Sequence, residues 1–313
     1  MRSTAVVLQE PENLVLADLE LVEPRAGDLL VAVEWSGISA GTERLLWTGE
    51  MPPFPGLGYP LVPGYESVGR VIETKDADRH LVGRRVFVPG SQSFSEVRSL
   101  FGATASHLVV PSTRAVPIDE TLAERGTLLA LAATAYHAVA GPSARLPDRI
   151  VGHGVLGRLI ARITVALGAA PPVVWERDRE RMQGAVGYEV CDPSEGIGKS
   201  FSTICDASGD ANLLDPLIAR LSPGGEIVLA GFYSDRLSFS FPPAFMREAK
   251  LRVAAEWKPA DLAAVHRLVE EGKLSLDGLI THQMPSSQAP QAYRAAFEDK
   301  SCLKMLISWS DKQ

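Results

Sequence analysis

The chain has 313 residues, which is enough for two domains with a substantial core. Hydrophobic residues make up 46% and charged residues 22%, as in an ordinary globular protein. The net charge of −7 and the lack of a basic run argue against a nucleic-acid surface. No signal peptide or membrane-length apolar run is evident, and the three cysteines lack metal-ligand spacing. We therefore expect a cytoplasmic protein with reduced thiols and no membrane span.

The chain up to about residue 117 is expected to be mostly β-structure. Short apolar runs separated by glycine and proline predict strands at residues 5–8, 14–21, 29–35, 67–73, 85–89 and 105–110. Residues 51–64 carry so many prolines that a helix or a central strand is excluded there. We expect an ordered loop, which is either a surface connection or, given its aromatic residues, a wall that faces a substrate.

A helix is expected over residues 121–140, and a glycine-rich turn follows it. Gly152, Gly154 and Gly157 form the pattern G-x-G-x-x-G, with an apolar run before it and helical apolar spacing after it. The first glycine allows a tight turn, the second lets the backbone approach a pyrophosphate, and the third lets helix and strand pack closely. The helix N-terminus supplies free N–H groups to the phosphates. The pattern predicts a dinucleotide site, and a turn without a ligand is the alternative.

An acidic residue follows the next expected strand, at residues 173–175. Glu176 lies 19 residues after Gly157 (176 − 157), where a carboxylate binds the ribose 2′-hydroxyl of NAD. Arg177 could instead pair with the 2′-phosphate of NADP, but the neighbouring carboxylate would repel that phosphate. We therefore predict NAD as the cofactor.

The rest of the chain alternates between strand and helix. The expected elements are strands at residues 201–206, 226–230, 250–255 and 303–309, helices at 213–221, 260–271 and 289–299, and a short element at 279–282. This alternation predicts a parallel sheet with helices on both faces, which binds ligands at the carboxyl ends of its strands. The predicted cofactor-binding residues are Gly152, His153, Gly154, Val155, Leu156, Gly157, Glu176, Arg177, Ala207, Ser208 and Gly231.

Three stretches resemble the medium-chain dehydrogenase/reductase family. They are Gly37-Ile-Ser-Ala-Gly-Thr-Glu43, Pro63-Gly-Tyr-Glu-Ser-Val-Gly69 and Leu276-Asp-Gly-Leu-Ile-Thr-His282. With the glycine pattern, the resemblance covers essentially the whole chain. It implies an α/β protein with a GroES-like β-rich catalytic domain, residues 1–117 and 258–313, and a Rossmann dinucleotide-binding domain, residues 118–257. The family is usually dimeric or tetrameric, so a homo-oligomer is an open alternative.

The chain departs from the zinc-dependent members of this family. Ser39 stands where they have a cysteine ligand and Tyr65 where they have a histidine ligand. Residues 90–104 contain none of the cysteines of their second, structural zinc site. Since hydroxyl and phenol groups are poor zinc ligands beside thiolate and imidazole, we predict that both metal sites are absent.

Within the family the chain resembles the zinc-free dehydrogenases of bacteriochlorophyll biosynthesis, most distinctively in its proline-rich residues 51–66. These enzymes oxidise the 3-(1-hydroxyethyl) group of a bacteriochlorophyllide to a 3-acetyl group. The resemblance implies an NAD-dependent secondary-alcohol dehydrogenase with this small-molecule substrate. A flat apolar macrocycle needs aromatic walls. The candidate substrate-binding residues are Trp35, Trp47, Phe54 and Tyr59.

Without zinc, a side chain must hold and deprotonate the substrate hydroxyl. By the resemblance, Ser39 and Tyr65 flank the nicotinamide and could do so, or they only fill the vacated ligand positions. Histidine is a common base in enzymes, so His137 is a third candidate, but on an apolar helix it could equally be a packing residue. His153 is expected to contact the pyrophosphate.

Two other functions stay open at this point. One is a zinc-free NADPH-dependent quinone or enoyl reductase, although those relatives usually begin the turn with alanine and lack the acid after the second strand. The other is a non-catalytic dinucleotide-binding protein that lost its activity with its metal.

Overall fold

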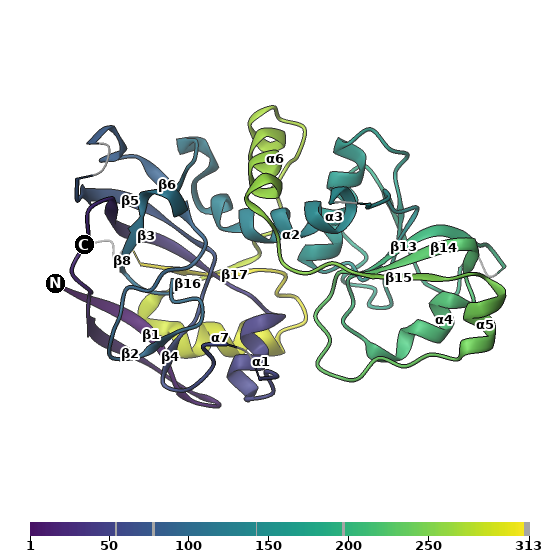
Figure 1. Cartoon of the computed structure of the whole chain (residues 1–313), viewed down its shortest axis with the longest axis horizontal. Coiled ribbons are helices and arrows are strands. Elements are labelled where there is room, and N and C mark those ends of the chain that lie inside the picture. The colour runs from purple at the N-terminus through teal and green to yellow at the C-terminus, as the bar shows by residue number, and fades with distance from the viewer. Residues whose placement is uncertain (54, 77–78, 142, 196–197, 310–313) are drawn as a thin grey trace. The chain divides into compact units, whose positions relative to one another are not determined.

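The computed structural model describes residues 1–53, 55–76, 79–141, 143–195 and 198–309 (Figure 1). The chain forms two compact units: unit 1 is Met1–Ala130 with Leu279–Gln313, and unit 2 is Leu131–Gly278. This division falls after residues 130 and 278, whereas the predicted domain boundaries fall after residues 117 and 257. Helix α6 (Pro259–Glu270) belongs to unit 2, where Asp261 near its start is hydrogen-bonded to His137. The domain boundaries read from the sequence stay a prediction.

Unit 1 is built from two β-sheets. One sheet has the strand order β2-β1-β4-β7, and the other has the order β16-β17-β3-β5-β6-β9, with β8 paired to β3. The six predicted strands correspond to β1, β2, β3, β5, β6 and β8 within a few residues. The strands of unit 1 are β1 (Arg2–Glu10), β2 (Asn13–Glu20), β3 (Asp28–Ile38), β4 (Leu61–Val62), β5 (Ser67–Thr74), β6 (Arg85–Val88), β7 (Arg98–Ser99), β8 (His107–Pro111), β9 (Val116–Pro117), β16 (His282–Pro285) and β17 (Met305–Ser308).

The proline-rich segment differs from its prediction at one point. Leu61 and Val62 form β4, which pairs with β1 on one side and with β7 on the other, so it is an inner strand. Neither residue is a proline, so both keep the N–H group that pairing requires. A short helix just before the segment, α1 (Thr42–Thr48), was not predicted because seven residues are too few to show helical apolar spacing.

The C-terminal tail completes unit 1. Helix α7 (Ala289–Glu298) packs against β16, β17 and β2. Strand β17 pairs with β3 in antiparallel register, with Met305 opposite Ile38. The short element predicted at 279–282 is instead β16, which begins at His282. The tail therefore lies beside β3, the strand that leads to Ser39.

Unit 2 contains the predicted parallel sheet. Its strand order is β12-β11-β10-β13-β14-β15, and every neighbouring pair is parallel. Helices α4 (Leu214–Ile218) and α5 (Phe241–Met246) lie together on one side of it (Figure 1). Buried apolar residues from the strands and α4, such as Ile204 and Leu217, form its core. The strands are β10 (Arg149–Val151), β11 (Val173–Trp175), β12 (Glu189–Cys191), β13 (Phe201–Asp206), β14 (Leu221–Leu229) and β15 (Lys250–Val253).

Two predicted helices are shorter than expected. The helix predicted over 121–140 is a 3₁₀ segment, η3 (Glu120–Leu128), which is interrupted at Ala123 with its positive φ of 45°, followed by α2 (Leu129–Ala140). The helix predicted over 213–221 is only α4 (Leu214–Ile218), since β14 already begins at Leu221. The other elements are α3 (Val155–Ala166), α5 (Phe241–Met246), η1 (Arg79–Leu81), η2 (Ser112–Arg114), η4 (Ala211–Leu213) and η5 (Ser286–Gln288). Within the described ranges, no helix combines the length and apolarity that crossing a membrane requires.

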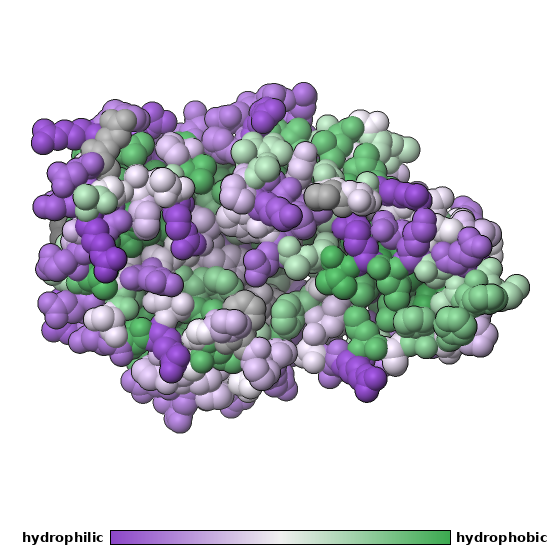
Figure 2. Space-filling view, viewed as in Figure 1, coloured by the Kyte–Doolittle hydropathy of each residue, from purple (hydrophilic) through white to green (hydrophobic). Residues whose placement is uncertain are grey.

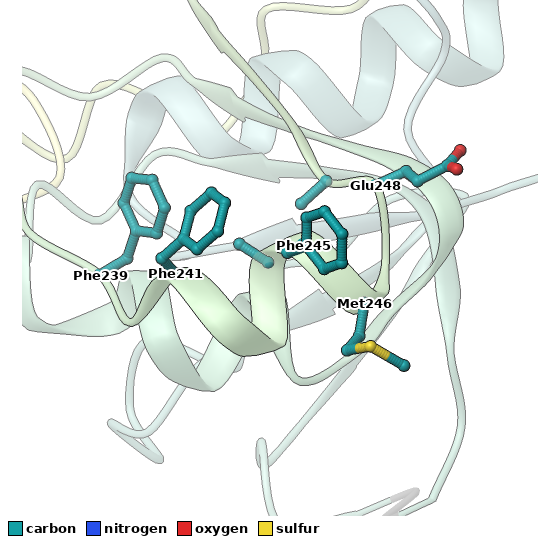
Figure 3. A pocket seen from close by; sticks show the side chains of 7 residues that line it. Phe239, Phe241, Phe245, Met246 and Glu248 are labelled. Carbon is teal, nitrogen blue, oxygen red and sulfur yellow. The ribbon is translucent and has the colours of Figure 1, made fainter.

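An apolar patch lies on the surface of unit 2. Phe241 and Phe245 of α5 are exposed, with ring centroids 5.7 Å apart. Together with Phe239, Met246 and Glu248 they line a pocket of about 480 Å³ (Figure 3). Hydrophobic surface gathers over the part of unit 2 where α5 and β15 lie (Figure 2). Exposed apolar patches of this kind often mark interaction surfaces.

Candidate active site

The three glycines of the predicted dinucleotide turn occupy three different environments. Gly152 follows β10 with a φ of 92°, which favours glycine. Gly154 caps the N-terminus of α3, and a Cβ built on it would meet no atom within 4 Å. A Cβ on Gly157 would overlap the carbonyl oxygen of Gly152. The open space at Gly154 and the free N-terminus of α3, which begins with Val155 and Leu156, fit an approaching pyrophosphate.

Glu176 is joined to this turn through its carboxylate. Oε2 accepts a hydrogen bond from the His153 backbone N–H at 3.0 Å. Oε1 accepts bonds from the N–H groups of Arg177 at 2.7 Å and Asp178 at 3.0 Å. A carboxylate has about four acceptor sites, so one remains for a ribose hydroxyl. The Arg177 side chain is exposed beside it.

The ring of His153 is not available to a pyrophosphate. It is fully buried, with Nδ1 2.6 Å from the Arg181 carbonyl oxygen and Nε2 2.8 Å from the Tyr188 hydroxyl. Burial lowers the pKa of His153 to about 4, so the ring is neutral at physiological pH. Because both ring nitrogens already have partners, the ring packs beside the turn, and a contact between His153 and the pyrophosphate stays a prediction.

A buried arginine that the sequence analysis missed holds the segment after Glu176. The Arg158 guanidinium donates to the carbonyl oxygens of His153, Arg181, Gln183 and Gly184 at 2.7–3.0 Å. It thereby ties α3 to the segment that follows Glu176. The only signal in the sequence is an arginine directly after the third glycine, on a helix whose other residues are largely apolar.

The other predicted cofactor residues lie at the carboxyl ends of strands β13 and β14. The Ala207 N–H donates to the Val151 carbonyl oxygen at 2.9 Å, so the ends of β13 and β10 are adjacent. Ser208 lies close enough to Gly152 that a Cβ there would sit 3.3 Å from the Ser208 Cα. Gly231 approaches the backbone of Gly209, with 2.9 Å from a built Cβ to the Gly209 nitrogen. The structure therefore brings these residues to one edge of the sheet, as the sequence predicted.

In unit 1 the structure brings Ser39 and Tyr65 together. The Tyr65 hydroxyl donates to Ser39 Oγ at 2.6 Å, and Thr42 Oγ1 lies 3.5 Å from it. The Tyr65 ring meets Phe101 edge-on at 4.9 Å. Burial, and secondly the charge of Glu66, raises the pKa of Tyr65. Tyr65 therefore stays a protonated phenol that donates a hydrogen bond.

Two buried carboxyl groups support this hydroxyl pair. Glu43 accepts bonds from the Ser39 N–H at 3.2 Å and from the Tyr293 hydroxyl at 2.6 Å. Burial raises the pKa of Glu43 to about 7. Glu66 is ion-paired with Lys304, and burial raises its pKa against the lowering effect of that partner.

This set of side chains does not fit a zinc ion. Among the described residues, no three His, Cys, Asp or Glu side chains are grouped so that they could hold a metal. Ser39 and Tyr65 instead hydrogen-bond to each other and present neutral oxygens, which are poor ligands for zinc.

His137 of α2 is part of a dyad within unit 2. Its Nδ1 lies 2.8 Å from Asp261 Oδ2, which also accepts the Lys258 N–H at the start of α6. A carboxylate at Nδ1 favours the tautomer that leaves Nε2 as an acceptor. This geometry allows His137 to accept a proton at Nε2. It is equally compatible with a structural role in which His137 links α2 to α6.

The candidate substrate residues are tied to their own unit. The Trp47 ring stacks on Tyr293 at 6.4 Å, and the Tyr59 hydroxyl donates to the Leu46 carbonyl oxygen. The Arg85 guanidinium lies over the Trp35 ring. Phe54 lies outside the described residues. These contacts give Trp47 and Tyr59 a structural role. That the candidate residues also line a substrate site stays a prediction.

Comparison with known proteins shows the family to which this chain belongs. Residues 25–120 match the alcohol dehydrogenase GroES-like domain family. The chain is 55% identical over 314 residues to the 2-desacetyl-2-hydroxyethyl bacteriochlorophyllide A dehydrogenase of Cereibacter sphaeroides. It is 51% identical over 312 residues to the protein of the same name from Rhodobacter capsulatus. Both alignments cover 99% of this chain and 99% of the relative.

Solved structures share the fold along nearly the whole chain. An alcohol dehydrogenase of Escherichia coli CFT073 in complex with NADH matches with a TM-score of 0.85 and 20% identity, covering 98% of this chain and 99% of the other. A dehydrogenase of Sinorhizobium meliloti 1021 bound to NADP matches with a TM-score of 0.83 and 23% identity, with the same coverage. The chain therefore belongs to the medium-chain dehydrogenase/reductase family, in the same group as the bacteriochlorophyllide dehydrogenases, and is an oxidoreductase that acts on CH–OH groups.

Proposed function

We propose that this protein is an NAD-dependent, zinc-independent secondary-alcohol dehydrogenase. It oxidises the 3-(1-hydroxyethyl) group of a bacteriochlorophyllide to a 3-acetyl group, a step in bacteriochlorophyll a formation. The observation that carries the proposal is the 55% identity, along 99% of the chain, to a relative whose name states this substrate. We place the reaction in the cytoplasm, because none of the three cysteines forms a disulfide.

The two units have separate tasks in this proposal. In unit 2 the glycine turn and Glu176 hold the dinucleotide, which accepts a hydride when bound. In unit 1, Ser39 and Tyr65 hold the substrate hydroxyl. Because Tyr65 donates to Ser39 Oγ, one lone pair of that oxygen remains to accept the substrate O–H, and its own hydrogen can pass to water. Ser39 can thus relay the proton that leaves the alcohol, while the protonated Tyr65 fixes its orientation.

An assay with the pigment tests this function. We expect purified protein to convert 3-(1-hydroxyethyl) bacteriochlorophyllide a to the 3-acetyl pigment with NAD, followed by the shift of the pigment absorption band. The same protein should not reduce quinones or enoyl compounds with NADPH at a comparable rate. A protein that binds NAD but leaves the pigment unchanged, or that prefers the NADPH-dependent reduction, would overturn the proposal.

Zinc independence can be measured directly. Since Ser39 and Tyr65 replace metal donors and bond to each other, purified protein should contain well under one zinc per chain by elemental analysis. Treatment with a chelator should leave the oxidation rate unchanged. Stoichiometric zinc, or a rate lost to the chelator and restored by zinc, would show that the metal is required.

Cofactor choice should depend on Glu176. Glu176→Ala is expected to weaken NAD binding by about 1–3 kcal/mol, because it removes a ribose acceptor and leaves the His153 N–H without its partner. It should also narrow the preference for NAD over NADP by removing the charge that repels the 2′-phosphate. Titration of both cofactors by fluorescence measures this, with Glu180→Ala, an exposed carboxylate four residues further on, as the control. A wild-type preference for NADP would make Arg177 the determinant instead.

The protein is expected to form homo-oligomers through the edge of unit 2. β15 is one of the two edge strands of its sheet, and its residues Leu251 and Val253 are 40% and 72% exposed. An unpaired edge can pair antiparallel with its own copy about a twofold axis, and the apolar patch of α5 would add buried area. Val253→Asp should therefore shift the chain to monomers in light scattering without lowering its melting temperature. Monomeric wild-type protein would contradict this expectation.

A further inference from the structure

The two segments that present Ser39 and Tyr65 meet one lysine from the tail. β17 pairs Met305 with Ile38, so Lys304 and Ser39 each lie one residue beyond the last pair of the two strands. The Lys304 side chain is only 2% exposed, although lysine is rarely buried without a partner.

Lys304 binds both segments at once. Its Nζ donates to the Ile38 carbonyl oxygen at 3.1 Å and is ion-paired with Glu66 Oε2. The Glu66 carbonyl oxygen accepts the Gly37 N–H at 2.8 Å, and a Cβ on Gly37 would overlap Glu66 Oε2. The residue before Ser39 and the residue after Tyr65 are thus fixed through the same ammonium group.

A second residue of the tail, Tyr293, is linked to the segment that carries Ser39. The Tyr293 hydroxyl donates to Glu43, which accepts the Ser39 N–H through its other oxygen. Each buried carboxyl group therefore binds one residue of the tail. Glu43 also accepts the Ser39 N–H, and Glu66 directly follows Tyr65 in the chain. A buried ion pair need not stabilise the fold, because well-packed neutral residues in its place often give the same stability. We therefore look for a role of this ion pair other than stability.

We propose that Lys304 and Glu66 are positioning residues that set the distance between Ser39 Oγ and the Tyr65 hydroxyl, so that the pair binds the substrate oxygen as one unit. This inference rests on the proposed function of that pair in alcohol oxidation. It assigns the tail a part in the chemistry although neither Lys304 nor Glu66 touches the substrate.

The test uses a neutral pair of similar size, because removing one partner alone would leave a buried charge. In the double variant Glu66→Gln with Lys304→Met, we expect kcat for the pigment to fall roughly 10-fold to 100-fold, the effect of misplacing a reacting group by about 1 Å. The dissociation constant for NADH, measured separately, should change little. Lys304→Arg should retain most of the activity, since its guanidinium can also reach Glu66 Oε1, which has no hydrogen-bond partner among the described residues.

A matched control removes an ion pair of unit 2, Glu226 with Arg252, which are 3.4 Å apart. Glu226→Gln with Arg252→Met should alter stability but not kcat. Wild-type kcat in the Glu66 and Lys304 double variant would overturn the proposal, as would an equal loss of kcat in the control.

A crystal structure of the double variant separates this inference from the proposed function. We expect the oxygens of Ser39 and Tyr65 to move from 2.6 Å to beyond hydrogen-bond distance. An unchanged distance between these two oxygens would refute the positioning role, even if the wild-type protein oxidises the pigment. Wild-type protein that fails to oxidise the pigment would refute the function, while the distance would still test the positioning.

Discussion

Tyr65→Phe and Ser39→Ala are each expected to lower kcat for the hydroxyethyl pigment by about 100-fold or more, the usual contribution of a positioned proton-transfer group. Loss of Ser39 removes the oxygen that accepts the substrate proton. Loss of the Tyr65 hydroxyl removes the donor that orients Ser39 Oγ at 2.6 Å. Steady-state kinetics with the pigment and NAD measures the effect, and NADH titration checks that cofactor binding is intact.

The two substitutions should be strongly non-additive. Because both act on one hydroxyl pair, the double variant should be little slower than the more damaged single variant. Thr48→Val, which removes an exposed hydroxyl at the end of α1 that bonds to Glu50, serves as the control. If Ser39→Ala and Tyr65→Phe keep wild-type kcat, the two residues merely fill the ligand positions and the proton acceptor must be sought at His137.

Gly154→Ala should weaken NADH binding by about tenfold or more, a loss of about 1.4 kcal/mol, without lowering the melting temperature. A Cβ at this position meets no protein atom within 4 Å, so the folded chain tolerates it. The methyl group would instead stand where a pyrophosphate must approach the backbone. Fluorescence titration and thermal unfolding of the same samples separate the two effects.

Gly157→Ala is the contrasting variant at the same turn. Its Cβ would overlap the Gly152 carbonyl oxygen, so the turn itself must shift. We expect it to lose both NADH affinity and thermal stability. NADH binding of wild-type strength in Gly154→Ala would show that no phosphate approaches this backbone, and the dinucleotide site would then have to lie elsewhere.

The amino-acid sequence by itself determined the elements that depend on local pattern. The glycine spacing at Gly152, Gly154 and Gly157 located the strand–turn–helix correctly, since the positive φ of Gly152 and the close approach of Gly157 to the Gly152 carbonyl oxygen are local requirements of the turn. The alternation of strand and helix predicted the parallel sheet, and Ser39 and Tyr65 were singled out without any knowledge of their distance. Proline content, in contrast, misled at Leu61, because pairing depends on the N–H groups of particular residues and not on the composition of a segment.

Only the tertiary structure decided how the side chains are partnered. Arg158, Lys304 and Tyr293 are separated in sequence from the groups they hold, and the ring of His153 is bonded to the distant Arg181 carbonyl oxygen. The break at Ala123 likewise has no signal in the apolar spacing of its surroundings. Such contacts arise because a buried polar group must find a partner wherever the packed chain supplies one, and sequence periodicity carries no information on which distant residue that will be.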